Sequence, residues 1–258
     1  MESGESKLAQ HRVRLLALDM DGTTLQNHEE ISDETRWWLF RARECGIEFT
    51  FATGRHIRGL PSTYAAALGV RVPIVTMNGG EVWTPDGQLI ERHTLPTEDV
   101  AWLHELARTY GERIGFWSAY TGGLADWDEF AKTYAERAWL KVGFFAEDEA
   151  VVAELWQVLG AHGGFELTNS HPLNIEVNPK GVTKASGLQT VVDFLGWSAE
   201  EVAAIGDSYN DIPMLRWAGL GIAMGNAQEA VKAEADWVTA RCDEEGVARA
   251  IERLLHQP

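Results

Sequence analysis

The chain has 258 residues, of which 45% are hydrophobic and 24% charged, and its formal net charge is −17. This length and apolar content suffice to bury a large core and exclude a disordered chain. Nucleic-acid binding needs lysines and arginines that neutralise phosphates, so we expect no nucleic-acid partner for so acidic a protein. The charge also disfavours an anionic membrane surface, and no apolar run reaches the roughly 18 residues of a membrane span.

The first twelve residues, MESGESKLAQHR, contain no apolar stretch of the kind that a secretory signal requires. The two cysteines, Cys45 and Cys242, lie far apart in the sequence and fit no metal-binding or redox spacing. We interpret both as reduced thiols, so these features together predict a cytoplasmic protein. No coiled-coil heptads occur, and we expect a monomer.

The first third of the chain alternates apolar strands with helices. Val13–Leu18, Ile47–Ala52 and Pro73–Met77 are short apolar runs, typical of buried strands. Ser32 is a candidate N-cap for a helix that Gly46 ends, and a second helix is expected over 57–68. This alternation predicts a parallel sheet with helices on both faces.

The pattern changes after Gly80 and returns at Thr183. A hairpin is expected over 82–91, and helical runs then alternate with short strands near 114–117, 141–145, 166–169 and 174–177. Strands and helices alternate again over 183–255, with strands expected at 202–205, 220–223 and 237–239. We therefore predict an α/β fold with a Rossmann-like doubly wound parallel sheet built from residues 1–81 and 180–258, and an α+β domain inserted at 82–179.

Tryptophan is concentrated in the inserted region. Large aromatic side chains usually belong to a core, which is the interpretation favoured here, and lining of a substrate pocket is the alternative. Six of the eleven tryptophans lie in or at the edge of the insert: Trp83, Trp102, Trp117, Trp127, Trp139 and Trp156.

The segment Asp19-Met20-Asp21-Gly22-Thr23 follows the first expected strand. In open parallel sheets, ligands bind beyond the carboxyl ends of the strands. Two carboxylates separated by one residue can face one site, where one binds a hard cation or attacks phosphorus and the other transfers a proton. An ordinary turn is the alternative, and an EF-hand is not, because the glutamate that closes its loop is missing.

Two shorter signals point to an anion. Thr53-Gly54-Arg55 ends the second expected strand, where a hydroxyl and free backbone N–H groups can cradle a phosphate oxygen. Lys184 lies near a helix start, a position that the helix dipole disfavours for a cation unless it faces bound anions. Each signal alone also fits a plain turn or an exposed lysine.

The hexapeptide 206–211, GDSYND, follows another apolar strand. A helical turn would bring Asp207 and Asp211 to one face, and with Asn210 they would offer oxygen ligands for magnesium. An acidic helix cap is the alternative. Taken together, the four carboxylates of these motifs require a cation to offset their negative charge. A phosphate could bind beside them only with that cation and Lys184.

These motifs resemble those of the haloacid dehalogenase superfamily, with DMDGTTL as the first motif, TGR as the second, Lys184 as the third and GDSYND as the fourth. An insert between the second and third motifs is similar to the cap domain of the Cof-like, type IIB members. The segments 77–80, 223–227 and 235–239 resemble the same group.

The resemblance implies a Mg²⁺-dependent phosphatase that acts on a small phosphorylated metabolite such as a sugar phosphate. It implies that Asp19 attacks phosphorus to form an aspartyl-phosphate, and that Asp21 is the general acid and base. The implied magnesium ligands are Asp19, the Asp21 backbone carbonyl and Asp207. Asp211 is expected to bind the ion through water or to orient the site.

The same resemblance implies a set of phosphate-binding groups: the side chains of Thr53, Lys184 and Asn210, the Gly54 turn, and the backbone N–H groups of Met20, Asp21 and Gly22. The cap is expected to exclude water and to contact the leaving group. Asn174, Glu176 and Arg55 are candidates for that contact, and the polar face of a strand or pairing with a carboxylate are the alternatives.

Two other functions are compatible with the sequence. A phosphotransferase or phosphomutase of the same superfamily would share Asp19 and Asp21 but return the phosphoryl group to a sugar. A non-catalytic ligand-binding protein on the same fold would not need both carboxylates. The sequence does not identify the substrate, because proteins that share a fold can act on different substrates.

Overall fold

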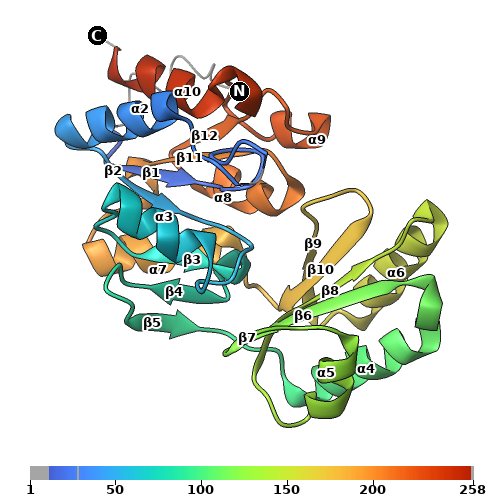
Figure 1. The fold of residues 1–258 in the computed structure, drawn as a ribbon. Helices are drawn as coiled ribbons and strands as arrows, with labels where there is room; N and C mark the ends of the chain where they lie inside the picture. The colour runs from blue at the N-terminus through green and yellow to red at the C-terminus, as the bar shows by residue number, and fades with distance from the viewer. Residues whose placement is uncertain (1–11, 28, 257–258) are drawn as a thin grey trace.

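A computed structural model describes residues 12–27 and 29–256, and the polar segment 1–11 lies outside the described residues. Figure 1 shows two lobes, one built on a five-stranded sheet with helices on both faces and the other on a second five-stranded sheet. Within the part that the structure describes, no helix is long and apolar enough to span a bilayer.

The larger lobe contains the predicted parallel sheet. Every pairing in it is parallel, and the strand order is β13 (Trp237–Val238), β12 (Leu220–Ala223), β11 (Val202–Gly206), β1 (Leu15–Leu18) and β2 (Glu48–Phe51). A parallel bridge between Ala52 and Val75 joins β3 (Ile74–Thr76) to this sheet. The central strand β1 therefore ends at the point where the strand order reverses, which is where ligands bind in such folds.

Helices cover both faces of this sheet, as expected. They are α2 (Asp33–Glu44), α3 (Leu60–Leu68), α7 (Lys184–Leu195), α8 (Ile212–Trp217), α9 (Glu229–Lys232) and α10 (Gly246–Leu255). Helix α2 packs against α10, whereas α7 packs against α8 on the other face (Figure 1). The Ser32 hydroxyl caps α2 by accepting a hydrogen bond from the Thr35 N–H at 3.0 Å, as its sequence position predicted.

The helix expected over 57–68 begins three residues late, at Leu60. Pro61 sits in its first turn, where the missing N–H of proline costs no intrahelical hydrogen bond. Residues 53–59 are left as a loop beside the carboxyl end of β1.

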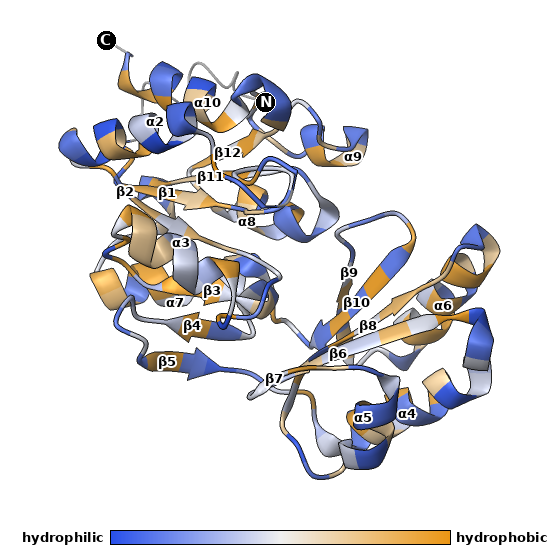
Figure 2. Cartoon of the chain, viewed as in Figure 1, coloured by the Kyte–Doolittle hydropathy of each residue, from blue (hydrophilic) through white to orange (hydrophobic). Residues whose placement is uncertain are grey.

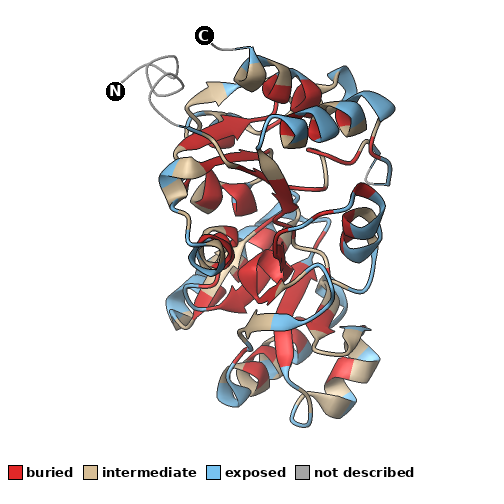
Figure 3. Cartoon of the chain, turned by 90° about the vertical axis from the view of Figure 1, so that its left-hand side faces the viewer, coloured by how far each residue is buried: buried red, intermediate tan, exposed pale blue. Residues whose placement is uncertain are grey.

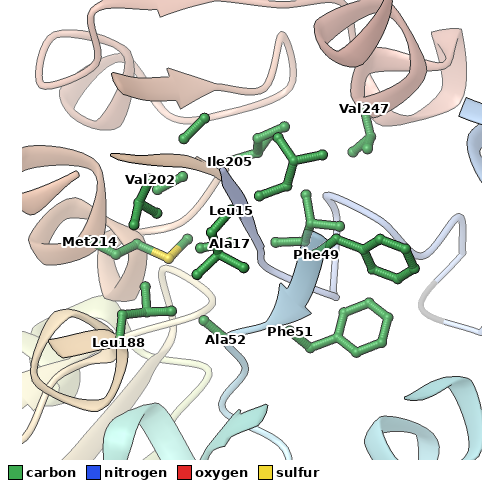
Figure 4. Packing of buried hydrophobic residues seen from close by; sticks show 14 of the residues in the cluster. Leu15, Ala17, Phe49, Phe51, Ala52, Leu188, Val202, Ile205, Met214 and Val247 are labelled. Atoms are coloured by element: carbon green, nitrogen blue, oxygen red, sulfur yellow. The ribbon is translucent and has the colours of Figure 1, made fainter. Parts of the chain in front are cut away.

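Strands β1 and β11 are completely buried. Figure 4 shows Leu188 and Met214 on one side of the central strands and Val247 on the other, so each face contributes to one continuous core. Figure 2 shows hydrophobic residues concentrated in the strands, and Figure 3 shows buried residues filling the sheets of both lobes.

The smaller lobe is an antiparallel sheet covered by three helices. Its strand order is β7 (Gly123–Ala125), β6 (Gly115–Tyr120), β8 (Trp139–Phe145), β10 (Asn174–Pro179) and β9 (Phe165–Thr168). The helices are α4 (Thr97–Tyr110), α5 (Trp127–Thr133) and α6 (Glu149–His162). A second apolar cluster, which includes Leu103, Trp139 and Leu155, fills the space between them.

The hairpin expected at the start of the insert pairs with the larger lobe instead. Strand β4 (Glu81–Trp83) lies between β3 and β5 (Leu89–Arg92), and Val82 belongs to the core of the larger lobe. The apolar cluster of the smaller lobe begins only at Leu95. We therefore propose that the inserted domain, called the cap below, comprises residues 93–179, and that the remaining residues form the core domain.

Candidate active site

The loop after β1 places Asp19 at the carboxyl end of the central strand. The Asp19 N–H donates to the Ile205 carbonyl at 3.0 Å, and the Thr24 hydroxyl donates to the Asp19 carbonyl at 2.6 Å. Gly22 turns the loop at φ 76°, and a Cβ there would lie 2.8 Å from a carboxylate oxygen of Asp207. The loop can therefore approach Asp207 only because residue 22 is glycine.

Three carboxylates converge around a buried lysine. Oxygen atoms of Asp19, Asp207 and Asp211 all lie within 4.8 Å of one another. The fully buried Lys184 donates from Nζ to Asp19 Oδ1 at 2.5 Å and to Asp211 Oδ1 at 2.7 Å. The Asp211 Oδ2 atom accepts hydrogen bonds from the Asp207 and Ser208 N–H groups, both at 2.9 Å.

Burial and mutual repulsion dominate the electrostatics of this cluster. Burial raises the pKa of the Asp19 carboxyl well above its ordinary value, Asp211 adds to the effect, and Lys184 opposes it. Burial and then Asp211 raise the pKa of Asp207 to about 6. Burial alone lowers the pKa of Lys184, but Asp19 and Asp211 outweigh it and hold that pKa above its usual value. One lysine therefore does not neutralise the cluster, which favours an added cation.

A raised pKa makes the stability of the metal-free protein depend on pH. The folded state favours the protonated form of the Asp207 carboxyl. The stability that this protonation provides is complete at pH values below the ordinary pKa of aspartate, and it is lost as the pH rises through about 6. In EDTA, Asp207→Asn is therefore expected to be more stable than the wild type by about 2 kcal/mol at pH 8, and by about half as much at pH 5. Urea unfolding at both pH values, beside the exposed control Asp128→Asn, measures this. An equal gain at both pH values would contradict it.

Asp21 and Arg55 form a bidentate pair beside the cluster. Arg55 Nε donates to Asp21 Oδ2 at 2.7 Å, and its Nη2 donates to Oδ1 at 2.5 Å. Of the two roles that the sequence left open for Arg55, the structure shows the pairing with a carboxylate. Thr53 is completely buried, and its hydroxyl accepts from the Arg55 N–H at 3.1 Å.

A cleft of about 530 Å³ joins these groups to the cap. Asp19, Asp21, Gly54, Asp207 and Asn210 line it from the core domain. From the cap it is lined by Trp117, Leu124, Lys141, Ser170, His171 and Glu176. The structure thus brings most of the predicted residues to one cleft, with Met20, Thr53, Lys184 and Asp211 buried around it.

Glu176 and Asn174, the two cap residues that the sequence suggested for contact with the leaving group, lie in different places. Glu176 is buried in the cleft wall, where its Oε2 atom accepts from Lys141 Nζ at 2.8 Å and from Asn78 Nδ2 at 2.7 Å. Asn174 instead holds the β9–β10 loop, because its Oδ1 atom accepts from the Ser170 and His171 N–H groups at 3.2 Å.

Lys141, Asn78 and Thr23 are among the residues of the site to which the sequence assigned no role. Lys141 Nζ donates to the Gly54 carbonyl at 3.0 Å, and a lone lysine in the apolar run WLKVGFF was the signal for it. Asn78 adopts a left-handed φ of 57°, which asparagine tolerates, and joins Glu176 to Asn210. The Thr23 hydroxyl donates to Asp207 Oδ1 at 2.8 Å.

Asn210 also lines a second cavity of about 620 Å³, which Lys184 borders as well and which lies between α6 and β9 of the cap and α8 of the core. Trp156 belongs to this cavity and Trp117 to the cleft that contains Asp19, whereas Trp139 is fully buried. These three tryptophans therefore divide between core and cavity walls, and neither interpretation from the sequence holds for all three.

Aspartates at the carboxyl end of a central parallel strand, beside a buried lysine and under a second lobe, suit the transfer of a phosphoryl group, because a carboxylate can attack phosphorus and a lysine can offset its charge. The family model of haloacid dehalogenase-like hydrolases matches residues 16–124 and 118–251. The chain therefore belongs to this family, and it is a Cof-like phosphatase of the haloacid dehalogenase superfamily, a hydrolase of phosphoric monoesters. Phosphatases of this family generally use a divalent metal, which the acidic cluster could bind.

Individual relatives match almost the whole chain. The 5-amino-6-(5-phospho-D-ribitylamino)uracil phosphatase YcsE of Bacillus subtilis is 39% identical over 93% of this chain and 94% of its own length. The phosphatase BT1666 from Bacteroides thetaiotaomicron is 28% identical, covers 95% and 96% of the two chains, and has a TM-score of 0.81. The subclass IIB sugar phosphatase BT4131 is 25% identical, covers 93% and 98%, and also has a TM-score of 0.81.

Proposed function

We propose that this protein hydrolyses phosphate monoesters of small metabolites through an aspartyl-phosphate formed on Asp19. The observation that carries the proposal is the position of the Asp19 carboxylate, in a cleft under the cap and 2.5 Å from Lys184 Nζ. The carboxylate oxygen would form a bond to phosphorus while the ester P–O bond breaks. Lys184 would reduce the repulsion between the carboxylate and the anionic substrate.

In this proposal, Asp21 transfers the protons. It would protonate the departing ester oxygen and then remove a proton from the water that hydrolyses the aspartyl-phosphate. Each Asp21 oxygen accepts one hydrogen bond from Arg55, and each keeps a second lone pair that could carry the transferred proton.

A magnesium ion fits the donor set, because hard cations prefer carboxylate and carbonyl oxygens. We propose that Asp19, Asp207 and the backbone carbonyl of Asp21 hold it. Asp211 would orient Asp207 and Lys184, since both its carboxylate oxygens already accept hydrogen bonds. When bound, the ion would supply positive charge that stabilises the transferring phosphoryl group.

The remaining predicted residues are proposed to bind the phosphoryl oxygens. Lys184 and Asn210 would contribute side-chain donors, and Thr53 would contribute its hydroxyl. The Gly54 turn and the N–H groups of Met20, Asp21 and Gly22 would surround the same position. Such donors, fixed before the substrate arrives, need little reorganisation during the reaction.

The substrate is proposed to be a small phosphorylated metabolite, with 5-amino-6-(5-phospho-D-ribitylamino)uracil as the first compound to test because a relative at 39% identity is named for it. The net charge of −17 disfavours nucleic acids and anionic membranes as partners. Both cysteines are free thiols, which accords with action in the cytoplasm, and we propose a monomer.

Phosphate release from a panel of phosphorylated metabolites, with Mg²⁺ and with EDTA, tests the proposal. We expect turnover with Mg²⁺ and a loss of at least about a hundredfold in EDTA, since the metal would neutralise charge throughout the reaction. Re-addition of Mg²⁺ should restore the rate. Undiminished turnover in EDTA would refute the metal, and isomerised sugar phosphate without released phosphate would indicate a mutase instead.

A further inference from the structure

The indole of Trp117 lies over a glycine of the cap sheet. Trp117 on β6 is the register partner of Gly143 on β8. A Cβ on Gly143 would lie 2.0 Å from Trp117 Cε2 and 2.2 Å from its Nε1 atom. The indole can occupy this position only because residue 143 has no side chain.

A buried lysine connects this indole to the loop of residues 53–59 in the core domain. Lys141 Nζ lies 4.9 Å from the centre of the Trp117 ring, within the range of a cation–π contact. The same Nζ donates to Glu176 Oε2 at 2.8 Å and to the Gly54 carbonyl at 3.0 Å. Because Lys141 is almost completely buried, these contacts fix the position of the ring relative to Gly54 and its loop.

Trp117 is only partly buried, and it lines the cleft that also contains Asp19 and Asp21. Leu124, with 64% of its surface exposed, lines the same cleft from the adjacent strand β7. Of the tryptophans in the described residues, Trp117 is the one that lines this cleft. An aromatic ring that packs on backbone and also lines a ligand site can serve as a stacking surface.

We propose that Trp117 stacks against the leaving group, so that the preferred substrates are phosphate monoesters of alcohols that carry a planar aromatic or heteroaromatic ring. This inference rests on the proposed function and assigns its substrate class. Planar rings stack on an indole through offset or edge contacts, and a planar ring places more of its atoms against the flat face than a puckered ring of the same size does. Trp117 is thus a specificity-determining residue, and Gly143 and Lys141 position it.

Benzyl phosphate and cyclohexylmethyl phosphate provide the test, because both are primary alkyl esters that differ in the planarity of one ring. The wild type with Mg²⁺ is expected to prefer benzyl phosphate by about tenfold in kcat/KM. Trp117→Leu should reduce this ratio to about one, and Trp117→Phe should retain most of it. A ratio of two substrates on one sample does not depend on the fraction of protein that is folded.

Gly143→Ala supplies an independent variant, since the added Cβ must displace the indole without altering Trp117 itself. It should lower the ratio as Trp117→Leu does. The matched control is Trp37→Leu, at an exposed tryptophan of α2 outside the cleft, and its ratio should equal that of the wild type.

The outcomes separate this inference from the proposed function. If both esters are hydrolysed but the wild type shows no preference, or Trp117→Leu leaves the ratio unchanged, Trp117 does not stack against the leaving group. The phosphatase proposal would be unaffected by either result. Absence of phosphate release from these esters and from every metabolite of the panel would overturn both.

Discussion

Asp19→Asn is expected to lower phosphate release by at least about 10⁴-fold, because an amide cannot form the covalent bond to phosphorus that the proposed mechanism needs. The replacement has the same shape and keeps an oxygen that can accept from Lys184. The fold should therefore persist, and thermal unfolding beside the wild type checks this. Steady-state release of phosphate from the best substrate of the panel, with Mg²⁺, measures the effect.

A second readout addresses the covalent intermediate directly. Wild-type protein quenched in acid during turnover of a ³²P-labelled substrate should retain label on the chain, and Asp19→Asn should retain none. Peptide mapping should place the label on the peptide that contains Asp19. Label that persists in the variant, or a loss of activity below about tenfold in a folded variant, would show that Asp19 is not the nucleophile.

Lys184→Met is expected to destabilise the protein by about 3–5 kcal/mol at pH 8, because it leaves Asp19 and Asp211 buried without their cation. The penalty should decrease at pH 5, where carboxylates with raised pKa values accept protons. The lysine itself stays protonated across this window, since its pKa is raised. Phosphate release should also fall by about 10³-fold, through loss of charge on the phosphoryl group.

Urea unfolding in EDTA at pH 8 and pH 5 measures this stability change. The matched control is Lys232→Met, which removes an ion pair between Lys232 and the exposed Glu229 on a surface helix. Exposed pairs contribute little, so its effect should stay below about 1 kcal/mol at both pH values. A penalty for Lys184→Met as small as that of the control would show that the buried lysine is not needed to offset the carboxylates.

The sequence predicts the core domain well because its signals are local and repeat along the chain. Strands of the parallel sheet formed at the apolar runs 13–18, 47–52, 202–205, 220–223 and 237–239, and carboxyl ends of parallel strands meet at one edge. Asp19 and Asp207, 188 positions apart, could therefore be placed together before any coordinates were known. The position of Lys184 followed from its place at the start of a helix beside the same edge.

The cap is less predictable, because antiparallel register and sheet membership depend on contacts between distant segments. The hairpin β4–β5 joined β3 rather than the cap, since nothing in its own residues specifies which sheet it extends. Lys141 and Glu176 lie on strands that pair across the sheet, so their ion pair cannot be read from either run alone. The position of the Trp117 indole likewise depends on the pairing of its strand with Gly143.

The insertion also has a consequence for the order of folding. The apolar cluster of the cap lies within residues 95–177, whereas β1 pairs with β11, about 187 residues later in the chain. Because short-range contacts form with less loss of chain entropy, the cap can fold while the core sheet still lacks its central pairing. During synthesis, Asp19 is made long before Lys184 and Asp207, so the site can assemble only after nearly the whole chain has left the ribosome.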